Sequence, residues 1–130
     1  MKSEFIHLVK DEYIYSYKKA SSIKMDYLSN FLTSDVCCSS IDSYLELAYD
    51  PEFHGGCGNA TWLEKEDGYM CLSDGIPDPD KPPTEPIWFK IPLPKYVTLL
   101  ETWREEVCKK RPSEVIIRYE NGDFIFETKE

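Results

Sequence analysis

At 130 residues, 42% of them apolar and 14% aromatic, the chain has the size and composition of one folded domain, which disfavours disorder outside a few loops. Its formal net charge is −9. No apolar run approaches the roughly 18 residues of a membrane-spanning helix, and the N-terminus alternates polar and apolar residues where a signal peptide is solidly apolar. The sequence therefore predicts a cytoplasmic protein without a membrane partner.

The negative charge is concentrated in the middle of the chain. Residues 35–86 contain twelve acidic residues and two lysines, a net charge of −10, whereas the rest of the chain carries +1. A concentrated negative field repels phosphate backbones and speeds encounter with a basic partner. The charge therefore disfavours direct nucleic-acid binding. The simpler alternative to a basic partner is that the acidic residues only keep the protein soluble.

The N-terminal third combines strand and helix patterns. Two short β-rich runs, 5–9 and 13–17, predict an antiparallel hairpin. Apolar residues at helical spacing, preceded by serines suited to an N-cap, predict a short helix over 23–32. The pattern of 41–49 fits a helix or a strand, and both remain open.

Glycine and proline divide the central part of the chain. Three glycines between residues 55 and 58 predict a tight loop. The Asp-Gly pair at 67–68, between the alternating runs 61–66 and 69–73, predicts a two-residue hairpin. The proline-rich acidic segment 74–86 predicts an exposed, stiff loop inside a single domain of residues 1–130.

The hairpin over 61–73 has two different faces. Its pairing places Leu63 opposite Leu72 on one face. The other face mixes acids with larger side chains: Trp62, Glu64, Glu66, Tyr69 and Cys71. Such a mixed face suits a binding surface, and it suits a half-covered sheet equally well.

The C-terminal third contains the strongest patterns. Residues 87–91 predict a strand, and 94–110 predict an amphipathic helix with an apolar stripe through Trp103. The runs 115–120 and 123–127, joined by Asn-Gly, predict another hairpin. The expected fold is α+β, an antiparallel sheet of about six or seven strands built from hairpins, with helices packed on one face.

Residue types that support catalysis or bind metals are few. His54 and Cys57 lie near each other and suit a nucleophile with its base, or, with Cys37 and Cys38, a zinc site, but the usual ligand spacing and an orienting group are missing. Five cysteines without a C-x-x-C pair predict reduced thiols. The sequence thus predicts no catalytic residue, no metal and no cofactor.

The layout of the C-terminal half resembles a known group of bacterial proteins. The segments that carry the resemblance are 58–63 (GNATWL), 69–74 (YMCLSD), 83–85 (PTE), 89–92 (FKIP) and 99–103 (LLETW). They resemble small immunity proteins that protect cells from contact-dependent growth-inhibition toxins and related polymorphic toxins. The resemblance implies a non-enzymatic inhibitor of one cognate toxin domain, often a nuclease with a basic substrate channel.

The contact surface is expected within residues 35–85. Acidic side chains can occupy a cleft built for phosphates, and aromatic side chains supply desolvated anchors. The candidate partner-binding residues are Asp42, Glu46, Trp62, Glu64, Glu66, Asp67, Tyr69, Asp74, Asp78 and Asp80. Two alternatives remain open: an adaptor or chaperone for a secreted effector, and a small enzyme that uses Cys57 and His54.

Overall fold

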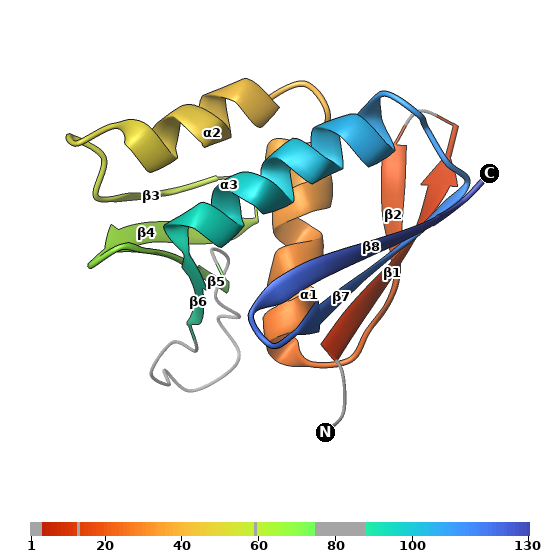
Figure 1. Cartoon of the computed structure of the whole chain (residues 1–130), viewed down its shortest axis with the longest axis horizontal. Coiled ribbons are helices and arrows are strands. Elements are labelled where there is room, and N and C mark those ends of the chain that lie inside the picture. Colours follow the sequence, from red (N-terminus) through yellow and green to blue (C-terminus); the bar gives the residue numbers. More distant parts are fainter. Residues whose placement is uncertain (1–3, 13, 59, 75–87) are drawn as a thin grey trace, which may run out of the picture.

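The computed structural model describes residues 4–12, 14–58, 60–74 and 88–130. Over these residues the chain forms an α+β fold with two antiparallel sheets of four strands each (Figure 1). The strand orders are β2-β1-β7-β8 and β3-β4-β5-β6. The predicted fold class is therefore confirmed, but the strands are divided between two sheets instead of forming one.

The first sheet joins the two ends of the chain. It consists of β1 (Glu4–Asp11), β2 (Ile14–Ala20), β7 (Glu114–Glu120) and β8 (Asp123–Lys129). Both predicted hairpins form, and β1 pairs with β7 with Ile6 opposite Ile117. The turn residues Asn121 and Gly122 have φ angles of 51° and 83°, the left-handed conformation that a two-residue hairpin turn requires.

The second sheet comes from the middle of the chain. It consists of β3 (Gly55–Cys57), β4 (Thr61–Glu66), β5 (Tyr69–Asp74) and β6 (Phe89–Pro92). The β4–β5 hairpin has the predicted register, with Leu63 opposite Leu72. Leu63 and Leu72 are buried and point to the core, and we call this side of the sheet its inner side.

Two of the helices continue as π-helical segments. Helix α1 (Ile23–Asn30) begins at Ser22, whose hydroxyl accepts a hydrogen bond from the Met25 amide at 3.3 Å, and continues as η1 (Phe31–Val36). Helix α3 (Leu93–Thr102) continues as η2 (Trp103–Cys108), close to the predicted 94–110. Helix α1 lies between the two sheets (Figure 1). One hydrophobic cluster therefore includes side chains from both sheets.

The open choice for 41–49 is decided in favour of a helix, α2 (Ile41–Tyr49). Its C-terminal end is held by Lys65 of β4, whose Nζ donates to the carbonyl oxygens of Leu47 and Asp50 at 3.1 and 2.9 Å. A cation at this end of a helix is favourable because the last carbonyl groups are unsatisfied and carry partial negative charge. Helix α2 thus lies over the inner side of the second sheet.

The prediction of reduced thiols is wrong for two of the cysteines. Cys38 and Cys108 form a disulfide, with their Cα atoms 5.5 Å apart, while Cys37, Cys57 and Cys71 are not in disulfides. The bond joins the segment after η1 to the end of η2, where the Trp103 indole also donates to the Cys37 carbonyl at 2.7 Å. Spacing along the chain gives no sign of this pairing, because it depends on how α1 and α3 pack.

Candidate functional site

The outer side of the β4–β5 hairpin exposes two large aromatic side chains among acids. Strand alternation sends the neighbours of buried Leu63 to this side, and Trp62 is 40% and Tyr69 41% exposed. The Trp62 indole donates to Glu64 Oε1 at 3.0 Å, and Glu66 lies directly opposite Tyr69. We call Trp62, Glu64, Glu66 and Tyr69 the acid–aromatic face.

Among the described residues, one acid and one lysine border this face. Asp67 is exposed at the hairpin tip, and Lys90 of β6 is the neighbour of Cys71. Cys71, the remaining residue predicted on this face, is buried. Burial raises the pKa of its thiol; the charge of Lys90 opposes this shift, and the charges of Glu66 and Glu64 add to it. The thiol therefore stays protonated at neutral pH, which does not suit a nucleophile.

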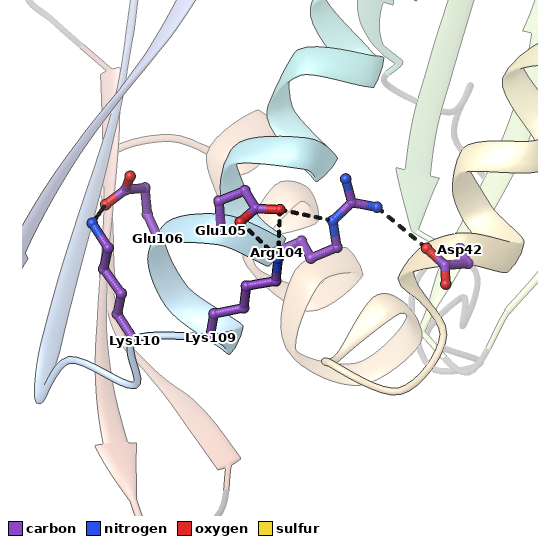
Figure 2. Close-up of polar contacts among 6 residues, drawn as sticks. All are labelled: Asp42, Arg104, Glu105, Glu106, Lys109 and Lys110. Carbon is purple, nitrogen blue, oxygen red and sulfur yellow. Dashed lines mark hydrogen bonds and ion pairs between the residues drawn. The ribbon is translucent and has the colours of Figure 1, made fainter.

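The acidic candidates on α2 lie elsewhere. Asp42 and Glu46 are exposed, but α2 covers the inner side of the sheet, so these two residues and the acid–aromatic face lie on opposite sides of the sheet layer. Asp42 also forms an ion pair with Arg104 at 3.3 Å, and Figure 2 shows Arg104 between Asp42 and Glu105. Asp42 thus links α2 to η2, and the ten predicted residues do not form one surface.

The ion pairs continue along η2. Glu105 also pairs with Lys109, and Glu106 pairs with Lys110, both at 2.9 Å and both at a spacing of four residues (Figure 2). The Lys109 hydrogen bond, followed by the charges of Lys109 and Arg104, lowers the pKa of Glu105. Ion pairs this exposed contribute little to the stability of the fold.

Three of the predicted acids have side chains outside the described part of the chain. Asp74 ends β5, and its side chain lies outside the described residues, as do Asp78 and Asp80.

A pocket of about 320 Å³ lies between α2, η1 and the β3–β4 edge of the second sheet. Its wall includes the aromatic residues Phe31, Tyr44 and Phe53 together with Asp35 of η1. Asp35 is only 6% exposed, and its Oδ1 accepts a hydrogen bond from the Ala60 amide at 2.8 Å. Burial, followed by the charge of Asp35, raises the pKa of the Tyr44 hydroxyl.

Gly58 fits this pocket because it has no side chain. A Cβ built there would lie 2.6 Å from Asp35 Oδ2 and 2.9 Å from the Tyr44 hydroxyl, both too close. The same addition at Gly56 would meet nothing nearer than Phe53 at 4.0 Å.

This contrast gives a matched pair of variants. We expect Gly58→Ala to lower the free energy of unfolding by about 1 to 3 kcal/mol because Asp35 and Tyr44 must shift, as in other overpacked sites. Gly56→Ala is the control and is expected to change it by less than about 0.5 kcal/mol. Urea unfolding of both variants measures the difference, and equal stability would show that this wall is loosely packed.

His54 and Cys57 are not brought together in the pocket. Cys57 belongs to the pocket wall and His54 does not. Residues three apart on an extended segment point to opposite sides, which explains the separation. The described residues contain no group of three His, Cys, Asp or Glu placed to hold a metal ion. Cys38, one of the candidate zinc ligands, is bonded to Cys108 in a disulfide.

Sequence reasoning missed the pocket residues Asp35 and Thr61. A signal for Asp35 was present, since it follows Leu28 and Leu32 at helical spacing and so falls on the buried stripe of the helix. An acid on an apolar stripe is a reason to look for a polar site. Thr61 gave no such signal.

Known proteins do not extend these observations. No family model matches the chain, and neither a curated protein nor a solved structure matches it significantly. Within the described part of the chain, no helix has both the length and the apolar character needed to cross a membrane.

Proposed function

We propose that this protein binds a basic partner protein through the acid–aromatic face, and that it serves as a cytoplasmic immunity protein that neutralises a toxin domain. The observation that carries the proposal is the exposure of Trp62 and Tyr69 at about two-fifths each, on a sheet face that also bears Glu64 and Glu66. The proposal includes no catalytic residue, cofactor or metal.

The energetic argument rests on the two aromatic side chains. Trp and Tyr are enriched among the residues that dominate protein interfaces, since each buries a large area at a low cost in side-chain entropy. The indole of Trp62 is already oriented by its hydrogen bond to Glu64, which reduces the ordering cost further. Burying both rings against a partner supplies most of the affinity.

The acids supply orientation and speed. Glu64, Glu66 and Asp67 favour a basic surface and repel nucleic acid, and charges at the rim of an interface mainly change the association rate. A nuclease domain with a basic substrate channel has the matching charge.

The adaptor or chaperone alternative receives less support. It calls for a helix with a broad exposed apolar face, but the apolar stripe of α3 and η2, including Tyr96, Leu100 and Trp103, is buried in the core.

The test begins with co-expression of the protein and the product of the neighbouring reading frame. We expect recovery of one basic protein whose toxicity is suppressed and whose affinity falls as salt rises. The double variant Glu64→Gln/Glu66→Gln should weaken binding by about three- to tenfold, mainly through slower association, and should reduce the salt dependence.

The matched control is Glu46→Gln/Glu52→Gln, which removes the same charge from exposed positions on or next to α2. Affinity in this control should stay within about twofold of the unmodified protein, since a uniform effect of net charge is weak in salt. Equal losses in the two double variants would contradict the assignment of the face. Recovery of a partner that stays active would contradict neutralisation.

A further inference from the structure

The pocket next to α2 has the size and lining of a small-molecule site. Its volume of about 320 Å³ lies at the lower end of the range for ligand pockets, about 300 to 1,000 Å³. The Phe31 and Tyr44 rings meet edge to face with centroids 5.3 Å apart, and Phe53, Leu47 and Leu63 complete the apolar part of the wall.

The charge of this pocket is negative. Among the described residues that line it, Asp35 is the only one with a formal charge, and no Lys or Arg faces it across the pocket. Asp35 is held in this wall with its Oδ1 accepting a hydrogen bond from the Ala60 amide. A buried carboxylate beside several aromatic rings favours a cationic group, by Coulomb attraction and by cation–π contacts.

A second polar group in the wall also indicates a ligand. Thr61 is 1% exposed, and its Oγ1 makes no hydrogen bond with any residue in the described ranges. Buried hydroxyl groups are almost always hydrogen-bonded, because an unmade bond costs about 1 to 3 kcal/mol. A ligand that donates an N–H group to this hydroxyl would remove the cost.

We infer that this pocket binds a small organic cation, an ammonium or guanidinium group on an apolar stem. The cationic end pairs with Asp35 and donates to Thr61, and the stem lies against Phe31, Tyr44 and Phe53. The site lies on the inner side of the second sheet, away from the acid–aromatic face, and does not rest on the proposed function. The cation has two potential sources, a free amine and the Lys or Arg side chain of a partner.

Two probes of nearly equal shape test the inference directly. We expect 2-phenylethylammonium to bind saturably at millimolar concentration or below and to shift the amide NMR signals of Gly58 and Thr61. The neutral 2-phenylethanol should bind at least about tenfold more weakly, since it lacks the charge that pairs with Asp35. Equal binding of both probes, or no saturable binding of the cation, would overturn the inference.

The chain offers a matched pair of blocking variants. Ser43 is exposed on α2 and lines the pocket, so Ser43→Tyr fills the entrance without disturbing the core and should abolish cation binding. Ser39 is also exposed but does not line the pocket, so Ser39→Tyr should bind as before. Asp35→Asn should weaken the cation about tenfold and leave the alcohol unchanged. Undiminished binding by Ser43→Tyr would locate the cation elsewhere.

The partner assay distinguishes the two sources. If a partner's side chain occupies the pocket, Ser43→Tyr weakens partner binding and 2-phenylethylammonium competes with the partner. If the ligand is a free amine, Ser43→Tyr leaves partner affinity unchanged. The probe comparison needs no partner, so failure of the proposed function leaves this test intact.

Discussion

Removing the Cys38–Cys108 disulfide is expected to lower the free energy of unfolding by about 4 kcal/mol, the value of the chain-entropy model for a loop of this length. The bond closes a separation of 70 residues, which gives the unfolded chain much freedom once the bond is broken. Urea unfolding of the double variant Cys38→Ser/Cys108→Ser, followed by tryptophan fluorescence, measures the loss.

Cys57→Ser is the control for this prediction, because Cys57 is exposed and is not part of a disulfide. It should change the stability by less than about 0.5 kcal/mol. The double serine variant should also match the unmodified protein under reducing conditions. If reduction leaves the stability of the unmodified protein unchanged, the disulfide does not contribute in solution.

The disulfide also bears on the proposed location. Cytoplasmic thiols are kept reduced, whereas disulfides persist in oxidising compartments. A cytoplasmic function therefore requires that the dithiol form stay folded, and the same urea experiment under reducing conditions tests this requirement. Unfolding of the dithiol form without denaturant would contradict the proposed location.

Replacing Trp62 by alanine is expected to have the largest effect on partner binding, a loss of about 2 to 4 kcal/mol or roughly 30- to 1,000-fold in affinity. The variant removes the larger of the two rings on the acid–aromatic face and also the hydrogen bond that orients Glu64. Calorimetry with the recovered partner measures the loss. Because Trp62 is 40% exposed, the stability of the free protein should change much less, which unfolding of the variant checks.

Local structure could be predicted well from the sequence. The Asp-Gly and Asn-Gly pairs specify turns with positive φ, and strand alternation then determines which residues face each other. For this reason the register of Leu63 with Leu72, and with it the composition of the acid–aromatic face, followed from the sequence alone.

Long-range arrangement could not be predicted in the same way. A hairpin pattern says nothing about which strand pairs with its open edge, so the pairing of β1 with β7 and the division into two sheets were missed. The disulfide and the pocket depend on the same information, because Cys38 meets Cys108, and Asp35 meets Ala60, only after the helices have packed.

The choice of α2 acids as partner contacts shows the same limit. Asp42 and Glu46 belong to the acidic middle of the chain, but charge counted along a sequence does not specify a direction in space. Packing of α2 on the inner side of the second sheet turns these acids away from Trp62, and Arg104 engages one of them.

The central claim is that the partner binds the acid–aromatic face, and the most direct measurement compares two tyrosines. Tyr69 lies on this face and is 41% exposed, while Tyr49, at the end of α2, is 72% exposed on the other side of the sheet layer. Calorimetric titration of the partner should show at least about a tenfold loss for Tyr69→Ala and less than about a twofold change for Tyr49→Ala. A loss confined to Tyr49→Ala would contradict the account and move the interface to α2.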